Sequence, residues 1–203
     1  MLYTVLVLAL AFTSGFVIMS VELLGGKIMA PYFGSSIYVW GSIITVFMVS
    51  LSVGYLTGGR LSVRNPHLSR YGLFFLFGAI TLIPLVAAGS EMMDFVFLHL
   101  EDPRYGSLVA ASMLFFIPTA VLGMIAPYSV RLLVDNKETS GQVAGSLYFI
   151  STLGSALGTL ATSFYFVLMF ELNVIIMSLQ AALIIGGLTA LVAGQMGLGD
   201  TSE

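Results

Sequence analysis

The feature that most constrains this chain is a series of apolar stretches, each about as long as a bilayer is thick. A hydrocarbon core of about 30 Å takes a helix of roughly 20 apolar residues. Proline, glycine and charge divide the chain into about six such stretches, at residues 4–28, 39–59, 71–88, 106–126, 144–169 and 173–194. The ten-residue alternation of an outer-membrane barrel is missing. The sequence therefore predicts an all-α polytopic membrane protein, with residues 1–203 forming one transmembrane domain.

Composition excludes several classes of function. With 58% hydrophobic and 8% charged residues and a mean hydropathy of +1.03, the chain is too apolar for an ordinary water-soluble domain. It has no cysteine, and its two histidines, His67 and His99, are far apart in sequence. Neither a metal site nor thiolate chemistry is therefore predicted. No basic surface indicates nucleic acid, and we expect no cofactor.

The basic residues predict an orientation. Of the seven, five follow the second or fourth stretch, and two, Lys27 and Arg104, lie on the other side. The five are Arg60, Arg64, Arg70, Arg131 and Lys137. By the positive-inside rule both termini are cytoplasmic, in a cell inner membrane. Residues 2–19 could alternatively be a signal peptide, but no Lys or Arg precedes them, so we interpret them as a retained helix.

Residues 90–103, "SEMMDFVFLHLEDP", are too short and too charged to span a bilayer. Ser90 suits the N-cap of a helix, and acidic residues alternate with apolar ones. We predict a short interfacial amphipathic helix on the side opposite the termini.

Small residues recur every four positions in two stretches. Ser50, Gly54 and Gly58 share one helix face, and Gly154, Gly158 and Thr162 share another. Such faces let helix backbones approach closely in lipid, within a bundle or between copies of a homo-oligomer. Helix packing alone is the simpler interpretation.

Two similar short segments each precede one of the glycine-spaced stretches: "GKIMAPY" at 26–32 and "GMIAPY" at 123–128. Three stretches separate the two, so they would lie on opposite sides of the membrane. This is the arrangement of two inverted three-helix repeats, which place a binding site at their interface. A chance match of six residues is the alternative.

Two charges fall inside the apolar run that begins the chain. Glu22 follows about twenty uncharged residues, so it either reaches the headgroups or faces the bundle, where a carboxylate needs a partner. Lys27 lies about 140° away around a helix. The two would meet only through a neighbouring helix or a break at Gly25-Gly26. Tyr32, Tyr38 and Trp40 suit either an interfacial aromatic belt or a ligand contact.

Three segments together resemble the membrane half of the spermidine synthase-like fused membrane proteins. They are residues 12–61, which include "SVELLGGKIMAPYFGSSIYVW", residues 123–133, "GMIAPYSVRLL", and residues 141–160, "GQVAGSLYFISTLGSALGTL". The resemblance implies a transporter-like helical module, which in that family is typically joined to a cytoplasmic aminopropyltransferase domain. Lys27 stands where an arginine is more usual. No segment here resembles the catalytic domain, so we do not expect this chain alone to be a synthase.

The resemblance and the residue patterns together give two candidate functions. The chain binds and transports a small polar or cationic solute such as a polyamine, or it anchors a separately encoded aminopropyltransferase-like enzyme. The expected ligand-binding residues are Glu22, Lys27, Tyr32, Trp40, Tyr128, Ser151 and Ser155. The expected docking residues are Arg60, Arg64 and Arg131, whose simpler interpretation is as snorkelling anchors. No catalytic residues are predicted, because no nucleophile and base can be paired.

Overall fold

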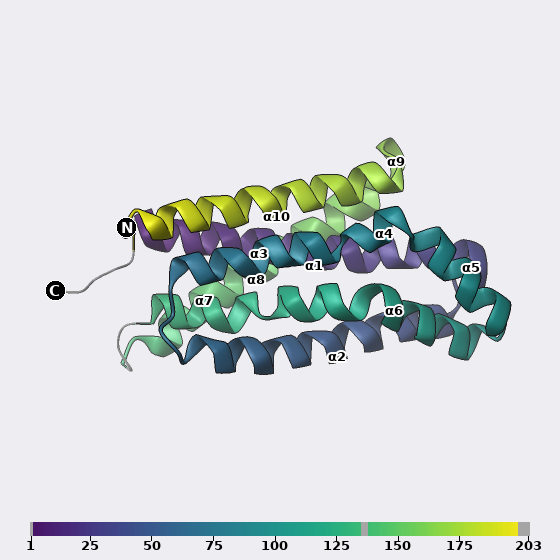
Figure 1. Cartoon of the computed structure of the whole chain (residues 1–203), viewed down its shortest axis with the longest axis horizontal. Coiled ribbons are helices and arrows are strands. Elements are labelled where there is room, and N and C mark those ends of the chain that lie inside the picture. The colour runs from purple at the N-terminus through teal and green to yellow at the C-terminus, as the bar shows by residue number, and fades with distance from the viewer. Residues whose placement is uncertain (1, 135–137, 199–203) are drawn as a thin grey trace.

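The computed structural model describes residues 2–134 and 138–198, and every regular element in those ranges is a helix (Figure 1). In chain order they are α1 Leu2–Phe33, α2 Ile37–Ser62, α3 Leu68–Thr81, α4 Ile83–Ala87, α5 Gly89–His99, α6 Pro103–Gly123, α7 Ile125–Leu133, α8 Ser140–Ala161, the π-helix η1 Thr162–Phe166, α9 Val167–Met169 and α10 Leu172–Gln195.

Six helical stretches in the described chain are long and apolar enough to cross a membrane, which confirms the predicted all-α polytopic class. They are Leu2–Phe33, Ile37–Ser62, Leu68–Ala87, Pro103–Leu133, Ser140–Met169 and Leu172–Gln195. Most of the observed helices are longer than the predicted stretches. Hydropathy falls where polar residues begin, whereas a helix continues until its backbone is interrupted.

The bundle has two distinct ends (Figure 1). The terminal end holds the start of α1, the α2–α3 connection, the end of α7, the start of α8 and the end of α10, and the other, the α5 end, holds α5. α5 confirms the predicted short helix and buries Met93 and Val96 while Glu91 and Asp94 are exposed. The predicted Ser90 cap is wrong. The helix begins at Gly89, because the chain turns directly out of α4 and leaves Ala88 at the N-cap.

The six spans pack as three pairs, α1 with α8, α2 with α6, and α3 with α10. Glycine makes each pair close. Gly154 and Gly158 of α8 lie against the Phe12 and Phe16 carbonyls of α1, where a Cβ would collide with the backbone. The other two pairs use the same contact, between Gly54 and the Ala120 carbonyl and between Gly72 and the Gly187 carbonyl. The predicted small-residue faces are confirmed as packing faces.

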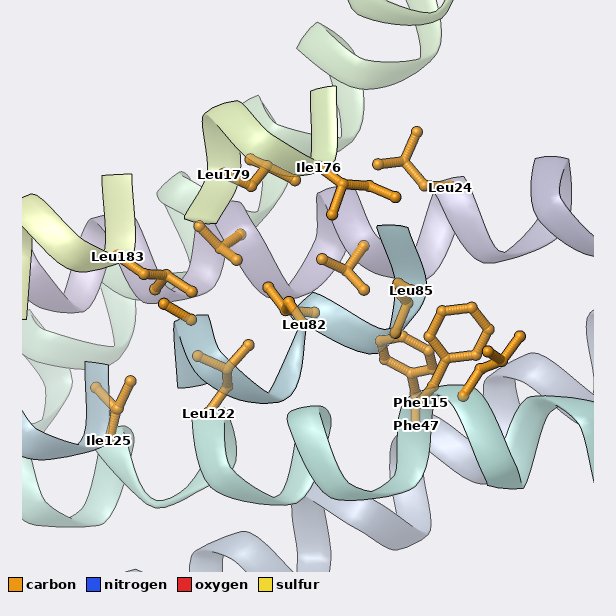
Figure 2. Close-up of a cluster of buried hydrophobic side chains, with 14 of the residues drawn as sticks. Leu24, Phe47, Leu82, Leu85, Phe115, Leu122, Ile125, Ile176, Leu179 and Leu183 are labelled. Atoms are coloured by element: carbon orange, nitrogen blue, oxygen red, sulfur yellow. The ribbon is translucent and has the colours of Figure 1, made fainter. Parts of the chain in front are cut away.

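A common apolar core joins the pairs (Figure 2). The side chains that fill it come mainly from α1, α2, α3, α6, α7 and α10, with smaller contributions from α4, α5 and α8 and from the α3–α4 connection. They include Leu24, Phe47, Leu82, Phe115 and Ile176, all buried. Buried hydroxyls also bond across two of the pairs: Thr162 donates to Ser20 Oγ at 2.9 Å, and the Ser42 and Ser107 hydroxyls lie 2.9 Å apart.

Three spans are interrupted at defined points. The third breaks between Thr81 and Ile83, next to Pro84, whose ring nitrogen has no hydrogen to donate. The fourth breaks at Met124, between α6 and α7. The fifth changes to the π-helix η1 before it ends at Met169.

Candidate functional site on helix α1

Glu22 and Lys27 lie on different sides of α1. The helix continues without a break through Gly25-Gly26, and Pro31 lies within its last turn. Five helical residues turn the chain by about 500°, which leaves the two side chains about 140° apart. The carboxylate and the ammonium therefore belong to two separate environments, and each needs its own description.

Glu22 shares a face of α1 with Gly15 and Gly26, which we call the Glu22 face. Gly15 precedes Glu22 by seven residues and is offset from it by about 20° around the helix, and Gly26 follows Glu22 by four residues and is offset by about 40°. Gly15 lies against the Ser151 carbonyl and the Ser155 hydroxyl of α8, and Gly26 lies against the indole ring of Trp40 in α2. The fold thus brings four of the predicted ligand-binding residues, Glu22, Trp40, Ser151 and Ser155, onto one side of α1.

The Glu22 carboxylate has no partner among residues 2–134 and 138–198. It is half-buried and makes neither a hydrogen bond nor an ion pair there. The Ser155 hydroxyl lies at the level of Gly15, about 10 Å along the α1 axis from Glu22, and donates back to the Ser151 carbonyl at 3.2 Å, within α8. A carboxylate within a membrane span is stabilised by a cation or by a proton. An indole ring and hydroxyls along the same face are groups that also hold an organic ammonium.

Lys27 and Tyr32 line a different space, a cavity of about 250 Å³ at the α5 end between α1, α4, α5 and α10. The Lys27 ammonium donates to the Val167 carbonyl at 3.1 Å, and the Tyr32 hydroxyl donates to the Ser90 carbonyl at 3.4 Å. The Asp94 carboxylate lies beside the same Tyr32 hydroxyl. These two predicted ligand-binding residues are therefore not part of the Glu22 face.

Tyr128 is placed away from both environments. It is buried in α7 at the terminal end, where its hydroxyl accepts a hydrogen bond from the His67 backbone N–H at 3.1 Å. Its ring packs against Tyr71 and Phe74 of α3. These contacts hold α7 and α3 together, and the structure does not bring Tyr128 together with the other expected ligand-binding residues.

The expected docking arginines gather at the terminal end. Arg60, Arg64 and Arg131 are exposed, as is Arg70, whose guanidinium donates to the Arg64 carbonyl at 2.7 Å. In the part of the chain that the structure describes, none of the four makes an ion pair. Lys137 lies outside the described residues.

Sequence reasoning missed several polar residues beside these sites. Thr162 and Ser20 bond across α1 and α8, and Asn173 lines the cavity that contains Lys27. Asp94 was recognised as an acidic residue of a short helix, without its contact to Tyr32. The small-residue spacing of Thr162 was a signal for the first contact. No sequence signal identified Asn173, because its neighbours in the cavity come from distant parts of the sequence.

Within the described ranges, no group of three or more His, Asp or Glu side chains is placed to hold a metal ion. Comparisons of the chain with protein-family models, with curated proteins and with solved structures found no match. The function is therefore argued from the geometry of α1 and its neighbours.

Proposed function

We propose that this chain binds a small organic cation at the Glu22 face and moves it across the membrane. The observation that carries this proposal is the half-buried Glu22 carboxylate, which has no counter-charge in the described chain although it lies in a membrane span. Lipid alone would strongly disfavour that charge. A cationic solute compensates it when bound.

The groups around Glu22 favour an ammonium over a bare metal ion. Trp40 presents an aromatic ring, the best cation–π partner among side chains, beside the α1 face. About 10 Å further along the same face, at Gly15, Ser151 and Ser155 add hydroxyls that exchange hydrogen bonds with a second amine of an extended ligand. The resemblance to spermidine synthase-like membrane proteins makes a polyamine the specific candidate within this class.

The pairing of the spans supports an inverted-repeat origin for the site. If each of the first three spans is matched with the corresponding one of the last three, α1 corresponds to α6, α2 to α8 and α3 to α10. The α1–α8 pair then corresponds to the α6–α2 pair, and the α3–α10 pair corresponds to itself. The "GKIMAPY" and "GMIAPY" segments fall in corresponding spans, the first and the fourth. Inverted repeats place substrate sites at the interface of their halves, and the Glu22 face lies where α1 of one half meets α8 of the other.

Uptake of labelled spermidine into vesicles that contain the purified chain tests the proposal. We expect Glu22→Gln to reduce binding and uptake at least tenfold, a loss of about 1.4 kcal/mol or more, because the amide is neutral. Glu171→Gln is the matched control, since Glu171 is exposed and its side chain makes no capping hydrogen bond to α10. Unchanged uptake with Glu22→Gln, or an equal loss in the control, would contradict the proposal.

A second candidate function rests on the exposed arginines of the terminal end. We propose as the alternative that Arg60, Arg64 and Arg131 dock a separately encoded, aminopropyltransferase-like enzyme through its carboxylates. Reversal of all three charges to Glu is then expected to abolish co-purification with that enzyme from mild detergent. Arg104→Glu, at the α5 end, is the control. If the chain purifies without any partner before mutation, the anchor function is wrong.

A further inference from the structure

The cavity that contains Lys27 is lined by polar as well as apolar side chains, and the Glu22 proposal does not use it. Residues of four helices form it, including Lys27 and Tyr32 of α1, Ser90 of α5 and Asn173 of α10. Its volume of about 250 Å³ is below the ~300–1,000 Å³ of pockets for drug-sized ligands, and so suits a small polar group.

The Lys27 ammonium has N–H groups available to hydrogen-bond a ligand. An ammonium carries three N–H groups, and one of them goes to the Val167 carbonyl, which lies in the last helical turn before the chain leaves α9. No other partner of Lys27 is found within residues 2–134 and 138–198. The ammonium is therefore held in place by the protein and still presents free donors to a ligand. A phosphate oxygen is the acceptor that such a group prefers.

Negative charge flanks the same cavity. Asp94 lies beside the Tyr32 hydroxyl, and Glu91 and Glu171 are the sequence neighbours of the lining residues Ser90 and Leu172. A free anion would be repelled by these carboxylates. A zwitterion, with a phosphate next to an ammonium, matches the Lys27 cation and the Asp94 carboxylate together.

The surroundings indicate a lipid as the source of that zwitterion. Lys27 lies about 9 Å along the helix axis from the end of α1. Tyr32 in the last turn of α1 and Tyr38 and Trp40 in the first turn of α2 are aromatic residues of the kind typical of the headgroup level. A second, apolar hollow of about 100 Å³ begins on the next residues of α10, between Phe166, Phe170 and Val174. A polar cavity with an apolar hollow beside it complements a headgroup and the start of its acyl chain.

We propose that this cavity binds the phosphoethanolamine headgroup of a phospholipid, with Lys27 on the phosphate and Asp94 on the ammonium. A primary ammonium donates hydrogen bonds to Asp94, whereas the quaternary ammonium of phosphocholine has no N–H to donate. The site therefore prefers phosphatidylethanolamine to phosphatidylcholine with the same acyl chains.

Native mass spectrometry of the full chain, with each lipid added separately, measures the binding. We expect Lys27→Gln to weaken phosphatidylethanolamine binding about tenfold, since a charge-assisted hydrogen bond is lost, and Lys27→Arg to retain it. Arg104→Gln is the control, because Arg104 is the other cation at this end of the described chain and lies over the Tyr38 ring outside the cavity. Equal losses in the two Gln variants would overturn the proposal.

Asp94→Asn gives an independent measurement that does not depend on a change within a span. Asp94 is exposed on α5, so the variant is expected to fold. It should bind the two phospholipids equally, through loss of the preference for phosphatidylethanolamine. A preference that persists would overturn the assignment of Asp94. Soluble glycerophosphoethanolamine distinguishes a lipid from a free headgroup: binding of the soluble compound as tight as that of the lipid would show that the acyl hollow has no role and overturn the lipid assignment.

Discussion

The α2–α6 and α1–α8 pairs are joined by the same contact, a glycine on a backbone carbonyl, yet their surroundings differ. α6 also packs against α1, α3 and α5, and 61% of the most apolar window of its span is buried. α8 packs almost entirely against α1, with a smaller contact to α7, and the corresponding share is 17%. α6 is therefore enclosed within the bundle, whereas α8 lies at its edge.

The exposed span that contains α8 is less apolar than the enclosed span that contains α6, the opposite of what exposure to lipid alone would favour. In the most apolar part of each span, the mean hydropathy is lowest in the exposed span that contains α8, at 1.4, against 2.2 in the enclosed span that contains α6. The exposed side of the α8 span carries Thr152 and Ser163 beside large apolar side chains such as Phe149, Leu160 and Phe164. A helix that faces only acyl chains is expected to be at least as apolar as a buried one. We interpret the Thr152 position on this side as facing water or protein.

The largest expected effect comes from filling the glycine contacts. Gly54→Val places a side chain against the Ala120 carbonyl, and Gly154→Val places one against the Phe12 carbonyl. We expect Gly54→Val to lower the free energy of unfolding by about 3 kcal/mol, because α6 is held from several sides, and Gly154→Val by about 1–2 kcal/mol, because α8 can move outward. Denaturation in mixed detergent micelles measures both.

The controls for these variants are Gly41→Val in α2 and Gly145→Val in α8, where a Cβ would meet no atom within 4 Å. Each should change the free energy of unfolding by well under 1 kcal/mol. A larger loss for Gly154→Val than for Gly54→Val would show that α8 is fixed as firmly as α6, and would remove the distinction between edge and interior.

A smaller effect is expected in the labelling rates of cysteines placed on the exposed surfaces of α8 and α6. The chain contains no cysteine, so single cysteines report their own positions. Thr152→Cys on α8 should react several-fold faster with a charged maleimide than Ile117→Cys on α6, because a thiolate forms in water and not among acyl chains. Both positions are exposed, Ile117 at 60%. Equal, slow labelling at the two cysteines would mean that α8 faces lipid.

The smallest effect is expected from the hydroxyls that bridge the pairs. Ser42→Ala removes the contact to Ser107 between α2 and α6. Ser20→Ala removes two contacts from α1, the bond from Thr162 of η1 and the bond that Ser20 donates to the Gly158 carbonyl of α8 at 3.4 Å. We expect each hydrogen bond lost to cost about 0.6 kcal/mol. Double-mutant cycles with Ser107→Ala and Thr162→Ala measure the pairwise energies. A cost of several kcal/mol for Ser20→Ala alone would make these bonds, and not glycine packing, the main attachment of α8.

The sequence by itself determined the class of fold and the spans. Apolar length, charge and proline placed all six spans and the short helix near Glu91 and Asp94, because a bilayer imposes the same thickness on every helix that crosses it. The small-residue rows at Gly54 and Gly154 also identified packing faces, since a glycine leaves the same gap wherever the partner lies. The angular separation of Glu22 and Lys27 followed from helix geometry alone.

Only the tertiary structure decided which residues share a site. Trp40 and Ser155 contact Gly26 and Gly15 on the Glu22 face because α2 and α8 both pack against α1. Lys27 faces the first turn of α10 because α10 packs against the same end of α1. Tyr128 was expected with them and instead packs on α3. Helices in lipid associate through complementary packing over many residues, because the hydrophobic effect contributes little free energy to contacts between them. The periodicity of one span therefore predicts that it has a packing face and not which helix covers it.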